Sequence, residues 1–246
     1  MEKSKEIFIY DDDIGSVSYI DHMGTDLTIV NSARVSFGAN KKQLDNRDKR
    51  LINYLVKHRH TSTFEHNVVT FKFVVPLYVR SQHHRHRTWS YNEISRRYTD
   101  KNITFYEPQM FRTQHESNRQ ASNENELINP SLRTNQFSHA LYPTSTWTAN
   151  DAMREHNSSS LRLFNSLVDK GVCREQARGV LPQNMYTEYY GTVNLNNLLK
   201  FVDLRTHDGA QWEIQKVAEA CLSIAEELWP RAVGSYRNIK YGEQES

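Results

Sequence analysis

The chain has 246 residues, of which 37% are hydrophobic and 24% are charged. Lysine and arginine number 31 against 29 aspartates and glutamates, so the formal net charge is +2. This balance excludes a generally basic protein that coats nucleic acid, because any basic surface must be local.

The cysteines and the N-terminal residues indicate in which cellular compartment the protein is expected. Cys173 and Cys221 form no CxxC motif and no zinc-ligand spacing, so we expect neither a disulfide framework nor a structural zinc. A reducing cytoplasm is therefore the expected location. Residues 1–13 are charged and contain no long apolar run, so they predict neither a signal peptide nor a membrane span.

The first half of the chain predicts strands separated by two helices. Residues 25–37 alternate loosely and predict a strand. Residues 45–58 carry apolar residues at helical spacing and predict a helix with Asp45 as its N-cap. Residues 67–76 alternate at period two and predict a strand, and Pro76 suits the first turn of a helix over 76–86. Residues 101–111 predict a further strand with a turn at Glu107–Pro108.

The second half of the chain predicts helices. Residues 114–149 are rich in Asn, Ser, Thr and Gln and predict a loop or a short irregular insertion. Four helical segments follow, and the first of them ends on Gly171, a residue suited to a helix C-terminus. They cover 152–171, 172–182, 194–205 and 210–230, with Cys221 in the apolar stripe of the last.

Strands followed by long helices, with little βαβ alternation, predict an α+β fold. The sequence contains no GxGxxG after a strand and no GxxxxGK[ST], so neither a Rossmann site nor a P-loop has support.

The segment HRHTSTFEH, residues 58–66, is a candidate metal site because it contains His58, His60, His66 and Glu65. Histidine ligands on one helix face usually lie at i and i+4, and these histidines do not. A polar turn in which Ser62 or Thr63 bonds backbone groups explains the segment better, so we expect no metal.

The segment RHRTWSYNEISRRY, residues 85–98, is the strongest candidate for a binding site. A solvated basic helix face and an anion site explain its composition equally well. The interleaving favours the anion site, because Arg85 and Arg87 can bind phosphate in a bidentate manner while Ser90, Asn92, Glu93 and Ser95 supply directional partners. A carboxylate among arginines does not help DNA binding but suits a ribose hydroxyl. The segment therefore predicts a nucleotide-sized ligand.

Two arginines further along the chain have structural explanations when judged alone. Arg178 follows Glu175 at i+3, the spacing of a helix-surface ion pair. Arg205 ends an apolar helical stripe, where a cation is favourable. Both cysteines are expected to be buried or inert rather than nucleophilic.

RHRTWSYNEISRRY matches every fixed position of RHRxxSxNExSxRY, the signature of the flavin-dependent thymidylate synthases. Other segments resemble that family in the same order, and together they span most of residues 28–220. They are ARVS (33–36), HRHTSTFEH (58–66), REQARGVLP (174–182), YGTVNLNNLLKFVDLR (190–205) and AQWEIQ (210–215).

The resemblance implies a reaction and an architecture. The reaction is methylation of deoxyuridylate at C5, with methylenetetrahydrofolate as carbon donor, NADPH as reductant, FAD as redox cofactor and no cysteine nucleophile. The architecture is an α+β fold with a central mixed or antiparallel sheet and long helices, in a single domain over 1–246 with 114–149 as a variable polar insertion. It also implies a homotetramer whose active sites are shared between subunits. The near-zero net charge, the cysteine usage and the N-terminal residues predict a cytoplasmic protein with no nucleic-acid or membrane partner.

The resemblance also implies roles for individual residues. Arg205 is similar to the arginine that faces the pyrimidine and assists its ionisation at N3. The implied cofactor-binding set is Ser36, His60, Ser62, Glu65, Arg85, His86, Arg87, Asn92, Glu93, Asn194, Asn196 and Lys200. The implied substrate-binding set is Gln82, Arg85, Glu93, Ser95, Arg97, Tyr98, Arg178 and Arg205.

Several positions depart from the family's common pattern. Arg59 stands where glycine is usual, and Thr63 where proline is usual. Asn196 replaces a frequent arginine, and Lys200, one helical turn later, could compensate for its charge. His83 and His84 replace aromatic or apolar residues. Two alternatives stay open: a nucleic-acid-binding module using residues 80–98, and a family variant that transfers another one-carbon unit or acts on a related nucleotide.

Overall fold

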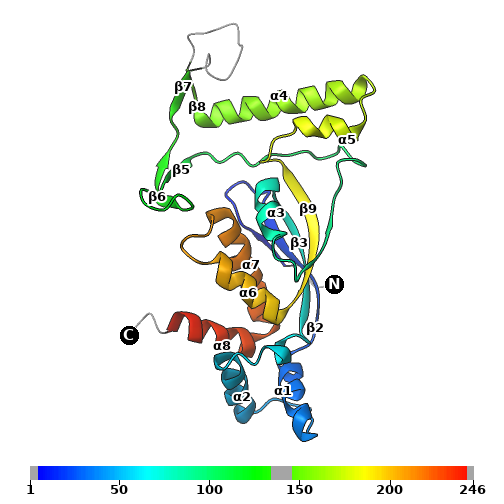
Figure 1. The fold of residues 1–246 in the computed structure, drawn as a ribbon, viewed down its shortest axis with the longest axis vertical. Coiled ribbons are helices and arrows are strands. Elements are labelled where there is room, and N and C mark those ends of the chain that lie inside the picture. Colours follow the sequence, from blue (N-terminus) through cyan, green and yellow to red (C-terminus); the bar gives the residue numbers. More distant parts are fainter. Residues whose placement is uncertain (1–4, 134–145, 243–246) are drawn as a thin grey trace.

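The computed structural model describes residues 5–133 and 146–242 (Figure 1). Its strands are β1 (Glu6–Phe8), β2 (Ser16–Met23), β3 (Val68–Pro76), β4 (Ser90–Glu93), β5 (Phe111–Gln114), β6 (Ser122–Ile128), β7 (Ser131–Arg133), β8 (Thr146–Thr148) and β9 (Tyr186–Asn194). Its α-helices are α1 (Asp26–Arg34), α2 (Asn46–Lys57), α3 (Leu77–His83), α4 (Ala149–Asp169), α5 (Arg174–Ala177), α6 (Leu195–Arg205), α7 (Trp212–Leu228) and α8 (Pro230–Tyr241).

The central sheet has five strands in the order β1-β2-β3-β9-β4, and every neighbouring pair is antiparallel. The period-two pattern predicted for residues 67–76 is confirmed, because Val69, Phe71, Phe73 and Val75 of β3 are completely buried. The α+β class and the antiparallel sheet agree with the sequence analysis.

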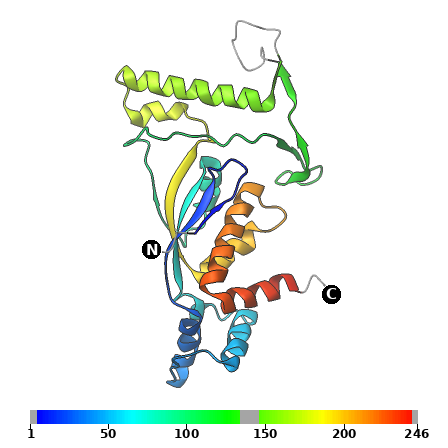
Figure 2. The ribbon, with the colours of Figure 1, turned by 180° about the vertical axis from the view of Figure 1, so that it is seen from behind.

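Helices α3, α6 and α7 cover the buried face of the sheet, as the two opposite views show (Figures 1 and 2). The apolar stripe predicted for the last long helix is confirmed: Ile214, Val217 and Cys221 of α7 are fully buried. Helix α8 packs on α2 and α7 at one end of the sheet, with its first backbone N–H groups bonded to the buried carboxylate of Asp26.

A second, smaller core lies at the opposite end of the sheet. There α4 and α5 pack around Phe164, Ala177, Leu181 and Met185, and α4 lies across the end of β9 (Figure 2). The predicted helix C-terminus is confirmed, since α4 ends at Asp169 and Gly171 has a φ of +87°, a value that glycine adopts without strain. Helix α2 also begins as predicted, with the Asp45 carboxylate accepting from the N–H of Arg47 and Asp48.

Two predicted strands are wrong. Residues 25–37 form helix α1 and a 3₁₀ turn rather than a strand, because the Thr25 N–H bonds Thr28 Oγ1 at the helix start and Asp26 must face α8. Residues 101–111 form one isolated bridge, Phe105 to Met185, before β5 begins at Phe111.

Two further predictions differ from the structure in part. The helix predicted over 76–86 is only α3, and Pro76 is its N-cap and the last residue of β3. The segment 114–149, predicted as loop, contains β6, β7 and β8, while 134–145 lie outside the described residues. Within the described chain, no helix has both the length and the apolar character needed to cross a membrane.

Candidate active site

Arg205, at the C-terminal end of α6, contacts the turn that follows α3. Its Nε donates to His86 Nε2 at 3.0 Å and its Nη2 donates to the backbone carbonyl of Gln82 at 3.3 Å. The Gln82 side chain in turn donates to Gln211 Oε1 just before α7. Two predicted substrate residues and one predicted cofactor residue therefore meet around a guanidinium that is oriented by two hydrogen bonds.

Burial, and then the Arg205 cation, lower the pKa of His86 from 6.5 to about 4. Burial also lowers the pKa of Arg205, with a further contribution from Arg85. At neutral pH His86 is therefore uncharged, and its Nε2 is the acceptor of the Arg205 hydrogen bond. The arginine is the only cation of this pair.

A pocket of about 560 Å³ opens beside β4, between α3 and the 3₁₀ turn Arg178–Val180. It brings together four residues of the predicted substrate set from two distant parts of the sequence: Glu93, Ser95, Arg97 and Arg178. No hydrogen bond or ion pair within the described residues joins Glu175 to Arg178, so the structural explanation of Arg178 is not supported. Four arginines line the pocket, which we call the arginine pocket: Arg80, Arg96, Arg97 and Arg178.

The sequence alone assigned no role to two of these arginines, Arg80 and Arg96. Arg80 pairs with Glu93 through Nε to Oε1 at 2.9 Å, and Thr187 Oγ1 donates to the same carboxylate oxygen at 2.7 Å. Arg96 is only 8% exposed and donates from Nη1 to the Lys101 carbonyl at 2.6 Å. The contacts of Arg80 with Glu93 and of Arg96 with the Lys101 carbonyl depend on the folded backbone, so the spacing of the motif gave no signal for either arginine.

A third group of predicted site residues, besides those around Arg205 and those in the arginine pocket, lies at the start of α6. The Asn194 side chain accepts from the Asn197 N–H at 2.9 Å and caps the helix, and Asn196 Nδ2 donates to Glu65 Oε1 at 2.8 Å. Thr63 Oγ1 donates to the His60 carbonyl at 2.9 Å, which confirms the predicted polar turn. The described residues contain no cluster of three or more His, Cys, Asp or Glu able to hold a metal.

The remaining predicted residues are mostly exposed. Tyr98 is 79% exposed, and its hydroxyl accepts from Arg97 Nη2 at 3.2 Å. The other exposed members of the two predicted sets are Ser36, His60, Ser62, Glu65, Arg85, Arg87, Asn92 and Lys200, together with Arg97 and Arg178 of the arginine pocket.

One chain does not bring all of the predicted residues together. Asn196 and Arg205 lie near opposite ends of an 11-residue helix, which separates their backbones by about 14 Å at 1.5 Å per residue. The arginine pocket lies at a third place, on the β4 edge of the sheet.

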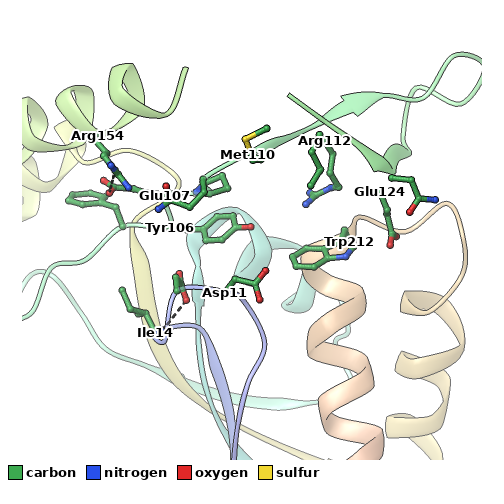
Figure 3. Close-up of a pocket in the computed structure, with 15 residues that line it drawn as sticks. Asp11, Ile14, Tyr106, Glu107, Met110, Arg112, Glu124, Arg154 and Trp212 are labelled. Atoms are coloured by element: carbon green, nitrogen blue, oxygen red, sulfur yellow. Dashed lines mark hydrogen bonds and ion pairs between the residues drawn. The ribbon is translucent and has the colours of Figure 1, made fainter. Parts of the chain in front are cut away.

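The cavity drawn in Figure 3 is a different feature, with a volume of about 600 Å³. It lies between the β1–β2 turn, the N-terminal end of α7 and the segment that leads to β5. Asp11, Tyr106, Glu124 and Trp212 line it, and it contains no predicted site residue.

The antiparallel sheet, its helical layer and the arginine pocket define an α+β protein that can bind a nucleotide-sized anion. The family described as thymidylate synthase complementing protein matches residues 18–231. The flavin-dependent thymidylate synthase of Thermus thermophilus is 41% identical over 224 residues, which is 91% of this chain and 76% of that relative. The enzyme of the same name from Thermotoga neapolitana is 37% identical over 229 residues, 93% of each chain.

Solved structures agree with this match. The UMP/dUMP methylase PolB from Streptomyces cacaoi, bound with 5-bromo-UMP, has a TM-score of 0.72 and 28% identity, covering 95% of this chain and 94% of that chain. The chain belongs to the family of flavin-dependent thymidylate synthases.

Family membership implies FAD as the cofactor, and the side chains present suit it. Arg85 and Arg87 are exposed, and no described residue hydrogen-bonds or ion-pairs with their guanidinium groups, which can therefore bind a pyrophosphate. The exposed hydroxyls of Ser36 and Ser62 can bond the sugar-alcohol chain of a flavin.

Proposed function

We propose that this enzyme methylates deoxyuridylate to thymidylate, using methylenetetrahydrofolate as carbon donor and NADPH as reductant. The observation that carries the proposal is the arginine pocket. It joins Ser95 and Arg97 of the signature to Arg178, about 80 residues away, around a cavity of about 560 Å³. A nucleoside monophosphate presents the phosphate that such a set of guanidiniums binds.

Each group of residues has a task in this reaction. The arginine pocket binds the phosphate. Arg205, fixed by His86 and Gln82, presents a cation that stabilises negative charge on the uracil ring, in the manner of a preorganised electrostatic site. Neutral His86 accepts from Arg205 and so orients it without adding a competing charge. Bound FAD supplies the transfer of reducing equivalents.

Neither cysteine is proposed as a nucleophile. Cys221 is fully buried in α7, and burial raises the pKa of its thiol well above 9.0. Cys173 is exposed, but it precedes α5 and lines none of the three groups described above.

The proposed active sites are shared within a homotetramer. The observation that the predicted residues of one chain form separate groups supports this proposal. Large apolar side chains adjoin them without cover: Val35 and Phe37 flank Ser36 at 71% and 86% exposure, and Leu204, next to Arg205, is 64% exposed. Such side chains are typical of a surface that a second subunit buries.

Thymidylate formation from labelled methylenetetrahydrofolate tests the reaction. Replacing Arg178 with alanine should raise the KM for deoxyuridylate about tenfold or more, the effect of losing a charged hydrogen bond. Arg174→Ala is the matched control, because Arg174 pairs with Asp100 outside the pocket. No thymidylate from the unaltered enzyme, or equal effects of both substitutions, would refute the proposal.

Uridylate is the second substrate to assay, because PolB is a UMP/dUMP methylase. We expect deoxyuridylate to have the higher kcat/KM. Shared sites are tested by mixing two chains whose kcat/KM is lowered by His60→Ala and by Arg178→Ala. The kcat/KM of mixed oligomers should exceed that of either variant alone if sites combine groups from different subunits, and should equal the average of the two variants if each chain contains a complete site.

A further inference from the structure

The side chain of Gln82 ends a chain of hydrogen bonds that begins at the cavity drawn in Figure 3. Gln82 Nε2 donates to Gln211 Oε1, and Gln211 Nε2 donates to Glu213 Oε2 at 2.8 Å. The other carboxylate oxygen of Glu213, Oε1, accepts from Arg112 Nη2 at 2.5 Å. We call these four side chains the amide chain. It links α3, the start of α7 and β5, which are far apart in the sequence.

Three contacts fix Arg112 at the cavity end of the amide chain. Its guanidinium lies over the ring of Trp212, with its Cζ 4.8 Å from the ring centroid, as the two labelled side chains in Figure 3 indicate. Its Nε donates to Ser122 Oγ at 2.9 Å, and its Nη2 donates to Glu213. Glu213 is only 3% exposed, so this ion pair is buried and gives the chain a rigid end.

This rigid end sets the order of donors and acceptors along the amide chain. A guanidinium can only donate and a carboxylate can only accept, whereas an amide has an oxygen and an NH2 group of nearly the same shape. Gln211 must therefore turn its NH2 group toward Glu213 and its oxygen toward Gln82. Gln82 must in turn direct its NH2 group toward Gln211. Within the described residues no hydrogen bond engages Gln82 Oε1, so this oxygen is left for a ligand.

The backbone of Gln82 contacts Arg205, the arginine that would face the pyrimidine. The Gln82 carbonyl accepts from Arg205 Nη2 at 3.3 Å, and both residues belong to the predicted substrate set. Uracil and cytosine differ at the edge formed by N3 and position 4. Uracil has an N–H beside an oxygen, and cytosine has an unprotonated nitrogen beside an amino group. An amide of fixed orientation matches only one of these edges, because turning it over exchanges its donor and its acceptor.

We infer that Glu213 and Gln211 are positioning residues that fix the Gln82 amide and thereby make the enzyme select uracil over cytosine. This inference rests on the proposed function, which makes deoxyuridylate the substrate. Neither residue belongs to the predicted site sets. The hairpin of β5 and β6 takes part in the selection, because its Arg112, bonded to Ser122, holds the Glu213 carboxylate.

Equilibrium binding of deoxyuridylate and deoxycytidylate to the FAD-loaded enzyme tests the inference without requiring turnover. Glu213→Gln is the decisive variant. Its new amide would turn its oxygen to Arg112, which can only donate, and its NH2 group to Gln211. Gln211 and Gln82 would then both turn over. The ratio of the affinity for deoxyuridylate to that for deoxycytidylate should fall about tenfold or more, the effect of one well-placed hydrogen bond. A purely structural role would weaken both nucleotides alike.

Two further variants complete the test. Gln211→Leu interrupts the amide chain but leaves the ion pair of Glu213 with Arg112 in place. It frees the Gln82 amide to adopt both orientations, so the affinity ratio should fall, though by less than in Glu213→Gln. Glu219→Gln is the matched control, because this carboxylate lies on the exposed side of α7 and bonds Lys216. It should leave the affinity ratio unchanged.

Equal affinity of the unaltered enzyme for both nucleotides would overturn the inference. So would an unchanged affinity ratio in Gln211→Leu, which decides the matter if Glu213→Gln does not fold, or an equal fall in Glu219→Gln. Thymidylate formation by an enzyme whose affinity ratio does not depend on Glu213 or Gln211 refutes only this inference. An affinity ratio that depends on them in an enzyme that makes no thymidylate refutes only the proposed function.

Discussion

Replacing Arg205 with glutamine tests whether this arginine sets the protonation state of His86. Burial is the larger cause that lowers the pKa of His86 from 6.5 to about 4, and the Arg205 cation is the second. The substitution removes the cation and leaves the burial. The pKa of His86 should therefore rise by less than half of that interval, and stay nearer to 4 than to 6.5.

The pH dependence of stability follows from the same shift. The unfolded chain binds a proton at His86 more tightly than the folded chain does, because the folded-state pKa is the lower one. The contribution of neutral His86 to stability is complete above pH 6.5 and is lost as the pH falls toward 4. In the Arg205→Gln chain this loss should span a narrower pH range.

Nuclear magnetic resonance of isotope-labelled histidine measures the titration directly. Arg50→Gln, which removes an exposed cation from α2, is the control and should leave the His86 titration unchanged. A pKa near 6.5 in the unaltered protein would refute the reasoning. An unchanged pKa in Arg205→Gln would show that the cation does not act on His86.

Three further predictions concern stability. Arg59→Gly should stabilise the chain by about 1 kcal/mol in urea unfolding, because the left-handed backbone at this position suits glycine; a loss of stability would contradict the assigned strain. Asp26→Ala should destabilise it by about 3 kcal/mol, since two backbone N–H groups of α8 lose a buried carboxylate acceptor; a change below about 1 kcal/mol would contradict that role. Burial alone would raise the pKa of Asp48, but hydrogen bonds, of which that from Lys41 is the largest, lower the pKa overall. The contribution of the ionised Asp48 to the free energy of unfolding is therefore complete above pH 3.8 and is lost as the pH falls below it. Asp48→Asn should therefore flatten the acid limb of the stability profile, and an unchanged limb would contradict this.

The helices and strands that were predicted correctly are those whose pattern lies in neighbouring residues of the sequence. The capped helix α2, the alternating strand β3 and the glycine after α4 all follow from neighbouring residues. Strand β9 was not predicted, although it pairs with β3 on one side and β4 on the other, because its partner β3 is more than a hundred residues earlier in the sequence. The loose alternation of residues 25–37 predicts a strand where the structure has helix α1, because the contact of Asp26 with α8 is tertiary and leaves no local pattern.

In the candidate site, too, residues within one sequence motif were predicted, whereas contacts that depend on the fold were not. The signature motif identified Glu93, Ser95 and Arg97, which the fold then brings to one pocket with Arg178. Arg80 was missed because its contact with Glu93 depends on how α3 leaves the sheet.

The visible spectrum of the purified protein under anaerobic conditions tests the central claim most directly. The flavin absorption bands should bleach when NADPH is added in the presence of deoxyuridylate, and should return once methylenetetrahydrofolate is supplied and thymidylate forms. A protein that stays colourless after FAD is added, or whose flavin NADPH cannot reduce, would contradict the proposed flavin-dependent methylation.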